Sequence, residues 1–259
     1  MSISPYYQQD GITIYHGDFR EIFPQVVRAA SVDLAMADPP YGETSLEWDH
    51  WPDRWPADVL PYVKPSGSMW CFGSLRMFLD RRDDFNGWKM SHEVVWEKHN
   101  GSGFHVDRFR RVHELAVHYT PAASKWADTY KSPRFTLDAT ARTVRKKEKP
   151  AQWHGKTGST TYVSQDGGPR MMRSVLQVRS CHGHALNETE KPAGILRPLI
   201  EYACPPGGLL LVPFVGSGSD LAVARELGIK AIGCEVREQQ CEVAANRMAQ
   251  GILFSGAAQ

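Results

Sequence analysis

Short apolar runs and stretches of alternating hydrophobic and polar residues follow one another along this chain of 259 residues. Period-two alternation and short apolar runs predict strands, whereas apolar positions three or four apart predict helices. A glycine-containing turn is expected at 98–103. This succession of short elements predicts a layered α/β domain. We expect strands near 12–15, 31–37, 68–72, 92–97, 115–119, 209–212 and 229–234, and helical segments near 18–27, 55–63, 75–85, 192–203, 220–227 and 237–249.

The apolar run 31–37 ends in the sequence Asp38-Pro39-Pro40-Tyr41. Two prolines end a strand, so Asp38 is expected just past its carboxyl end, where open α/β sheets bind ligands. An ionised Asp38 and the Pro39 carbonyl can only accept hydrogen bonds, and the Tyr41 ring offers a face for stacking. The stretch therefore predicts a site for a flat substrate with an NH2 group. An ordinary turn is the alternative that these four residues alone leave open.

A second signal lies between 209 and 235, where an apolar run, a glycine turn at 213–219, a helix and another strand follow in order. Glu235 ends that strand, 19 residues after Gly216. Glycines let the backbone approach a ligand, and an acid at this distance can hold ribose hydroxyls. Position 221 is Leu, so the third glycine of a dinucleotide site is missing. A nucleoside with a short tail, such as S-adenosylmethionine, is favoured over a nicotinamide cofactor.

Charge is distributed unevenly, although the net charge is only +1. Residues 121–186 hold twelve Lys/Arg and four Asp/Glu, a net charge of +8, which leaves −7 for the remainder. The segment has poor periodicity and interleaves aromatic residues with the cations. Cations neutralise phosphates and aromatics contact bases, so we expect nucleic-acid contact rather than only a solvated loop. The candidate DNA-binding residues are Arg145, Lys146, Lys147, Arg170 and Arg173.

Five cysteines are scattered without a Cys-x-x-Cys pair, which favours a reducing cytoplasm. The segment Cys181-His182-Gly183-His184 has no second ligand pair at a suitable spacing, so no metal site is expected. The first residues do not resemble a signal peptide, and no apolar run approaches membrane-spanning length.

The order of the motifs resembles that of the β-class DNA amino-methyltransferases. Asp-Pro-Pro-Tyr at 38–41 is followed by the basic region 121–186, by Thr-Glu-Lys-Pro at 189–192 and by Phe-x-Gly-x-Gly at 214–218. The resemblance implies a Rossmann-like S-adenosylmethionine-dependent methyltransferase fold with circularly permuted motif order. Its mixed, mostly parallel sheet would carry helices on both faces. Residues 1–120 and 187–259 would form the catalytic domain, and 121–186 an irregular target-recognition region.

The resemblance also assigns residues. Asp38, Pro39, Pro40 and Tyr41 would hold a base flipped out of the duplex. Asp18 would lie beside the cofactor, with a plain helix N-cap as the alternative. Family members usually carry Asp before the Pro-Phe of the cofactor motif, whereas this chain has Val212. The other residues implied to hold S-adenosylmethionine are Lys191, Phe214, Gly216, Ser217, Gly218 and Glu235.

The implied activity is methyl transfer from S-adenosylmethionine to adenine N6 in double-stranded DNA, of the kind found in restriction-modification. Cytosine-N4 enzymes of the family more often carry Ser in place of Asp38, which favours adenine. The alternatives are cytosine N4, RNA or a glutamine side chain as the methyl acceptor. A weakly active DNA-binding regulator is a further alternative, motivated by Val212. The resemblance also implies a possible homodimer, but no dimer surface can be identified in the sequence.

Overall fold

A computed structural model describes residues 3–102, 106–146, 160–181, 185–186 and 189–250. The chain divides into two compact units. The main unit comprises Met1–Ser132 and Ser174–Gln259, and the insert unit comprises Pro133–Arg173. The insert unit thus covers fewer residues than the basic segment 121–186, because residues 121–132 and 174–186 belong to the main unit. None of the described helices is long and apolar enough to cross a membrane.

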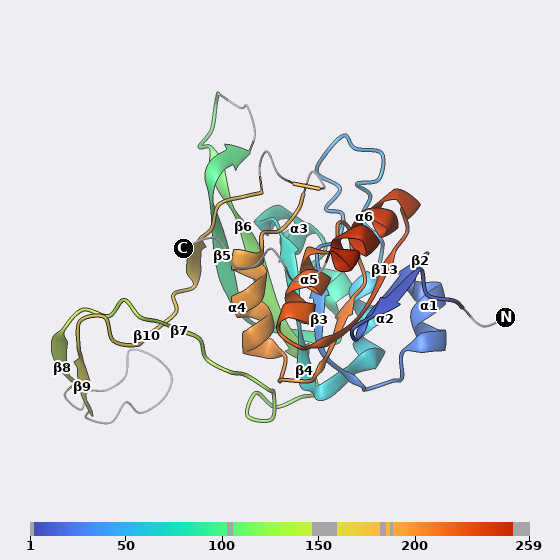
Figure 1. Cartoon of the computed structure of the whole chain (residues 1–259). Coiled ribbons are helices and arrows are strands. Elements are labelled where there is room, and N and C mark those ends of the chain that lie inside the picture. Colours follow the sequence, from blue (N-terminus) through green and yellow to red (C-terminus); the bar gives the residue numbers. More distant parts are fainter. Residues whose placement is uncertain (1–2, 103–105, 147–159, 182–184, 187–188, 251–259) are drawn as a thin grey trace. The chain divides into compact units, whose positions relative to one another are not determined.

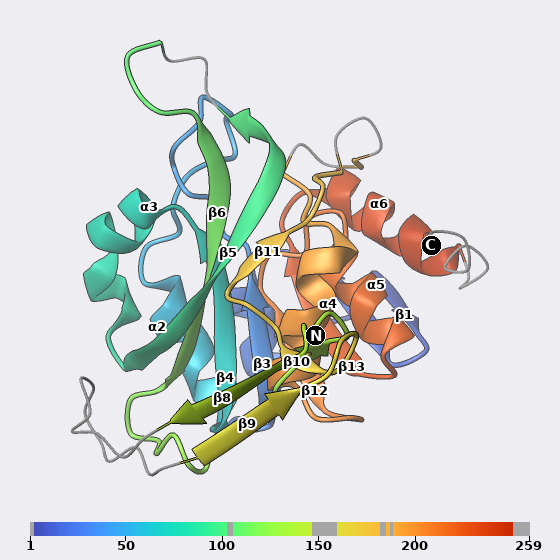
Figure 2. The ribbon, with the colours of Figure 1, turned by 90° about the vertical axis from the view of Figure 1, so that its left-hand side faces the viewer.

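The main unit is built on a sheet with the strand order β1-β2-β13-β12-β3-β4-β6-β5-β11 (Figures 1 and 2). Strands β2, β13, β12, β3 and β4 are parallel, and β6 pairs antiparallel with both β4 and β5. The predicted mixed, mostly parallel sheet is therefore confirmed. The strand bounds are β1 (Tyr7–Gln9), β2 (Ile12–His16), β3 (Val32–Ala37), β4 (Val63–Gly73), β5 (Trp88–Ser102), β6 (Arg111–Pro121), β11 (Val175–Gln177), β12 (Leu209–Val212) and β13 (Lys230–Glu235).

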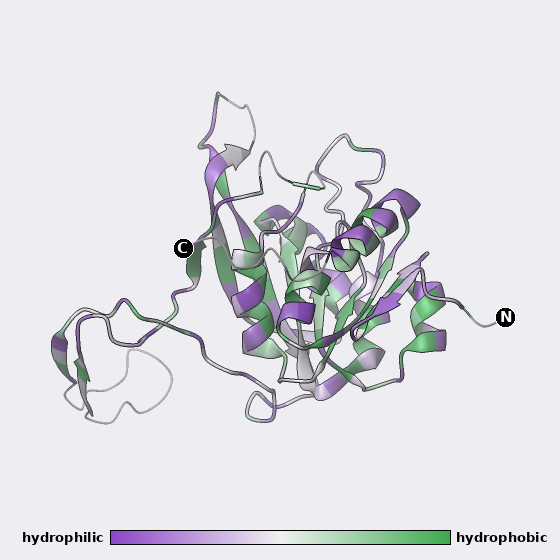
Figure 3. Ribbon diagram, in the orientation of Figure 1, coloured by the Kyte–Doolittle hydropathy of each residue, from purple (hydrophilic) through white to green (hydrophobic). Residues whose placement is uncertain are grey.

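Helices cover both faces of this sheet because the inner strands are apolar on both sides. Along β3, Leu34 and Met36 pack with α4, α5 and α6, whereas Ala35 and Ala37 pack with α1, α2 and α3. Figure 3 shows the resulting hydrophobic residues along the inner strands. The helix bounds are α1 (Phe19–Val26), α2 (Trp55–Val59), α3 (Leu75–Asp80), α4 (Ala193–Ala203), α5 (Ser219–Glu226) and α6 (Glu238–Ala249), with 3-10 turns η1 (Leu60–Tyr62) and η2 (Arg82–Phe85).

Three sequence expectations need correction. The predicted turn at 98–103 is wrong for 98–102, because β5 continues through Ser102 and pairs there with Arg111 of β6. Pairing along this long hairpin overrides the local glycine signal. The helix expected at 55–63 is α-helical only to Val59, and the helix expected at 75–85 changes to a 3-10 turn after Arg81.

The insert unit consists of two small two-stranded sheets. One pairs β7 (Phe135–Thr136) with β10 (Arg170–Met171), and the other pairs β8 (Arg142–Lys146) with β9 (Thr160–Ser164), both antiparallel. Among the side chains described in this unit, Ala139 alone is buried. The unit therefore has regular backbone pairing but almost no hydrophobic core, which explains its poor hydrophobic periodicity.

Candidate active site

Two adjoining cavities lie at the carboxyl edge of the parallel strands. The smaller cavity, about 280 Å³, extends over the ends of β12 and β13 and the start of α5. The larger cavity, about 630 Å³, lies beside the β5–β6 hairpin and the segment that follows β3. The strand ends meet here because the parallel strands run in one direction. Residues that line both cavities are Asp38, Pro40, Trp48, Thr189, Glu190 and Lys191.

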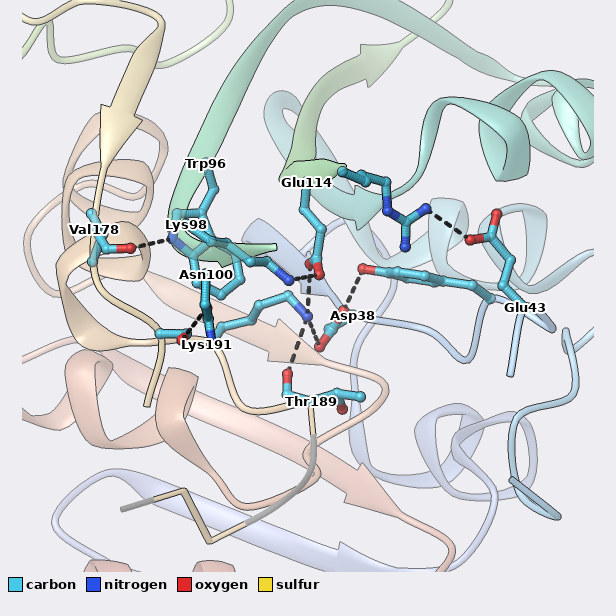
Figure 4. A network of polar contacts seen from close by, with 12 residues as sticks. Asp38, Glu43, Trp96, Lys98, Asn100, Glu114, Val178, Thr189 and Lys191 are labelled. Carbon is cyan, nitrogen blue, oxygen red and sulfur yellow. Dashed lines mark hydrogen bonds and ion pairs between the residues drawn. The ribbon is translucent and has the colours of Figure 1, made fainter. Parts of the chain in front are cut away.

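A buried ionic cluster stands where the cavities meet (Figure 4). The Lys191 ammonium lies 2.6 Å from Asp38 Oδ2, 3.4 Å from Glu114 Oε2 and 3.2 Å from the Thr189 carbonyl oxygen. The ammonium donates hydrogen bonds to Asp38 and to the Thr189 carbonyl, and its contact with Glu114 is an ion pair. Lys98 of β5 pairs with Glu114 from the other side. The Lys191 side chain is only 5% exposed, so its charge is compensated almost wholly by protein groups.

The cluster shifts the pKa values of its members in directions set by burial and by neighbouring charge. Burial works against the Lys191 ammonium, but Asp38 and Glu114 outweigh it and raise the pKa of Lys191. Burial alone would raise the pKa of Glu114, yet Lys191 and Lys98 lower it to about 2. Burial raises the pKa of Asp38, and the bonds from Lys191 and Tyr41 limit that rise. The Asp38 carboxylate, held by Lys191 and Tyr41, therefore has a higher affinity for a proton than an ordinary aspartate.

Tyr41 is tied to the same carboxylate. Its hydroxyl donates to Asp38 Oδ1 at 2.9 Å, and the Lys191 ammonium lies 5.8 Å from the centre of its ring. Pro39 and Tyr41 line only the larger cavity, whereas Asp38 and Pro40 line both. The four residues of the Asp-Pro-Pro-Tyr sequence thus stand together, and Asp38 lies at the boundary between the cavities.

The glycine turn after β12 closes on Glu235 at the end of β13. Gly216 has φ +51°, and its N–H donates to Glu235 Oε2 at 2.8 Å. The Arg237 N–H donates to Glu235 Oε1 at 2.9 Å. Oε1 also accepts from Arg237 Nε at 3.4 Å, whereas Oε2 keeps a further lone pair that can accept from a ligand in the smaller cavity. The backbone of the turn therefore fixes the orientation of this acid.

The smaller cavity also contains Asp18, Phe214 and Ser217. Asp18 caps α1 by accepting from the Arg20 N–H at 2.9 Å, so it is an N-cap and a lining residue at once. Gly218, with φ +76°, does not line the cavity. A Cβ there would lie 2.9 Å from Ala244 Cβ, so this glycine allows α5 to pack closely on α6.

Residues 32–246 match the family model described as DNA methylase of the N6/N4 type. The chain belongs to this DNA methylase family. Among curated relatives, the type II methyltransferase M.HinfI of Haemophilus influenzae is 26% identical over 267 residues, covering 91% of this chain and 68% of the relative. The type II methyltransferase M1.MboII of Moraxella bovis is 24% identical over 242 residues, covering 84% of this chain and 89% of the relative.

Solved structures of DNA methyltransferases share the fold of this DNA methylase. The M1.HpyAVI–SAM complex superposes with a TM-score of 0.61 at 22% identity, covering 92% of this chain and 98% of that one. The cytosine-N4-specific PvuII DNA methyltransferase superposes with a TM-score of 0.67 at 14% identity, covering 98% of this chain and 90% of that one. The expected methyltransferase fold is thereby confirmed.

Several residues of this DNA methylase site were not identified from the sequence. Glu114 and Lys98 enter it only because the long β5–β6 hairpin brings them beside Lys191, and neither belongs to a local motif. Asp49 accepts from the N–H groups of Gly42 and Thr44 at 2.9 and 2.8 Å and so fixes the loop after Tyr41. The spacing of an acid several residues after a glycine turn could have indicated such a loop bond.

The cations expected to contact DNA lie in the insert unit. Arg145 and Arg173 are exposed, and Arg170 pairs with Asp138 at 3.6 Å. Lys147 lies outside the described residues, and for Lys146 only the backbone is described. Of the segment 181–184, where no metal site is expected, Cys181 lines the larger cavity, while His182 and His184 lie outside the described residues.

Proposed function

We propose that this DNA methylase transfers the methyl group of S-adenosylmethionine to the N6 amine of an adenine flipped out of double-stranded DNA. The main support for this function is the wall that the two cavities share. Asp38 borders both, so a methyl donor in the smaller cavity and an amine in the larger one would meet beside this carboxylate. Such positioning is the main source of catalysis for a direct transfer.

The groups that line the smaller cavity suit this cofactor. The Phe214 ring is held edge-on by Phe19 and Trp55, at centroid distances of 5.6 and 5.3 Å, and presents an apolar surface. Glu235, fixed by the glycine turn, would accept from the ribose through Oε2. Carboxylates at this end of the sheet match a ligand that carries positive charge. Bound S-adenosylmethionine supplies an electrophilic methyl group on a sulfonium.

Asp38 and Pro39 would make the target amine a better nucleophile. The lone pair of an exocyclic amine is delocalised into the base, which makes the nitrogen a poor nucleophile. Acceptors at the Asp38 carboxylate and the Pro39 carbonyl would hold its hydrogens, favour a pyramidal nitrogen and stabilise the charge that develops there. The methylated nitrogen must then lose one proton. Asp38, whose pKa is raised by burial, would receive it.

Lys191 and Tyr41 would position Asp38. Both donate to its carboxylate, one to each oxygen, and leave the remaining lone pairs for the substrate. The Tyr41 ring borders the larger cavity, where it would replace the stacking that a flipped base loses. Arg145, Arg170 and Arg173 of the insert unit would contact phosphates and so place the duplex.

The choice of adenine is supported by Asp38 itself, since family members that act on cytosine N4 more often carry Ser at this position. A carboxylate forms stronger, charge-assisted bonds to an amine than a hydroxyl does. Purified protein should be incubated with S-adenosylmethionine and unmethylated DNA, and the DNA digested to nucleosides for mass spectrometry. We expect N6-methyldeoxyadenosine. N4-methyldeoxycytidine as the only product would replace adenine with cytosine, and the absence of both would contradict the proposed reaction.

A further inference from the structure

Asp220 is a buried acid in the first turn of α5, and its side chain borders the smaller cavity. It is only 6% exposed, yet no hydrogen bond or ion pair joins its carboxylate to another described residue. The other acids around the cavity have such partners. Asp18 accepts from the Arg20 N–H, Asp38 pairs with Lys191, Glu190 with Arg247, and Glu235 accepts from Gly216 and Arg237.

A buried carboxylate without a partner is costly, because it has lost its hydration and gained nothing in return. Burial raises the pKa of Asp220 to about 7, and the charges of Asp38 and Glu190 act in the same direction, against Lys191 and Arg247. Arg247 cannot compensate fully, because its guanidinium donates to Ser219 Oγ at 2.7 Å and to Glu190 Oε1 at 2.6 Å. The arrangement leaves a carboxyl group without a partner among the described residues on the cavity wall, and a cationic ligand group would both stabilise its charge and donate hydrogen bonds to it.

The opposite end of the same glycine turn lacks a charge. Val212 stands at the end of β12, where members of the resembled family usually carry Asp, and its side chain is fully buried in the apolar core. The cavity therefore has no acid at that strand end. Asp220, eight residues later and beyond the glycine turn, lines the cavity.

We propose that Asp220 accepts hydrogen bonds from the α-ammonium group of the methionyl end of S-adenosylmethionine. The inference rests on the proposed function, because it assumes that the smaller cavity holds this cofactor. The cofactor carries two cationic centres. Only the ammonium has N–H donors for a carboxylate, whereas the sulfonium has none.

Binding calorimetry on the full chain tests this assignment. Asp220→Asn keeps the shape of the side chain and removes its charge, and Glu226→Gln makes the same change at the far end of α5, outside the cavity. Three ligands are needed. S-adenosylmethionine has both cationic centres, S-adenosylhomocysteine keeps the ammonium with a neutral sulfur, and 5′-methylthioadenosine lacks the whole amino-acid end.

Asp220→Asn should weaken the binding of S-adenosylmethionine and S-adenosylhomocysteine alike, by roughly 10- to 100-fold. Its affinity for 5′-methylthioadenosine should stay within about twofold of wild type, as should every affinity of Glu226→Gln. Equal weakening for all three ligands would mean that Asp220 only shapes the cavity. Weakening for S-adenosylmethionine alone would place the acid at the sulfonium.

Unchanged binding by Asp220→Asn would also overturn the assignment. Tighter binding would do so too, because it would mean that Asp220 faces the cofactor's carboxylate and repels it. Failure of the wild-type protein to bind any of the three ligands would instead contradict the proposed function. Failure of the Asp220 assignment and failure of the methyltransferase assignment therefore give different results.

Discussion

The main unit and the insert unit use charge in opposite ways. At the candidate active site, Lys191 and Glu114 are almost buried and compensate one another within a cluster of acids and bases. In the insert unit, Arg145 and Arg173 are exposed, and the unit has almost no core. Buried charges interact strongly but are costly to desolvate, whereas exposed charges interact weakly and are screened by salt. Single changes should therefore have large effects in the main unit and small, salt-dependent ones in the insert unit.

The largest effect on stability is expected for Lys191→Met. The substitution keeps much of the side-chain volume but leaves Asp38 without its cation and Glu114 with Lys98 alone. Breaking a buried pair in this way typically costs about 3–5 kcal/mol of unfolding free energy. Urea denaturation should show this loss with little dependence on salt. Arg82→Met is the control, because Arg82 is 83% exposed and its pair with Asp83 should contribute less than about 1 kcal/mol.

If Lys191→Met costs no more than Arg82→Met, the cluster is not held by buried charge, and the large effect expected for single changes at the candidate active site is absent.

A gain in stability is expected for Asp220→Asn without cofactor. The pKa of Asp220 is raised from 3.8 to about 7 in the folded protein. The folded state therefore holds this proton more tightly than the unfolded state, and stability is lost as the pH rises from about 4 through 7. Asn does not titrate, so the variant should gain on wild type across this window, by up to about 4 kcal/mol at pH 8.

Unfolding free energies from pH 4 to pH 8 measure that gain, with Glu226→Gln as the matched control. A constant difference between variant and wild type across this range would show that Asp220 carries no unusual cost. A variant that is more stable yet binds the cofactor less well would show that the acid is kept for the ligand rather than for the fold.

Sequence patterns predicted the main unit well where local signals mark a strand end. The two prolines after β3 and the glycine turn after β12 both stop a buried strand, so Asp38 and the turn could be placed at the ligand edge. The partners of Lys191 could not be identified in this way. Glu114 and Lys98 reach it through pairing along the β5–β6 hairpin, which continues across a segment that looked like a turn.

Asp220 was missed for a related reason, because an acid in a first helical turn is common and suggests only a favourable helix start. Its burial and lack of a partner emerge only when the end of β3, the glycine turn and α6 are brought together. The structure of the insert unit could not be predicted from the sequence for a different reason. Side chains there are exposed on short ribbons, so hydrophobic periodicity is weak and carries little information about structure.

A smaller effect, confined to DNA binding, is expected when Arg145, Arg170 and Arg173 of the insert unit are changed together to Gln. Each lost phosphate contact should reduce the slope of log affinity against log salt by up to about one unit. Cofactor affinity and folding should stay close to wild type. Fluorescence anisotropy with a labelled duplex over a salt series gives the slope.

Arg82→Gln is the control for the insert-unit substitutions, since it removes an exposed cation from the main unit. Equal slopes for wild type, the triple variant and the control would mean that these three arginines do not face DNA, and that the basic character of the insert unit has another purpose.

The most direct test asks whether cofactor and target amine meet beside Asp38. It measures transfer of an isotopically labelled methyl group from S-adenosylmethionine to duplex DNA by the wild-type protein and by Asp38→Asn. Cofactor affinity should be measured on the same preparations. We predict that label enters adenine with the wild-type protein. The variant should transfer it at least about 100-fold more slowly while its cofactor affinity changes only several-fold. A near-wild-type rate for Asp38→Asn, or no label in DNA with the wild-type protein, would contradict the account.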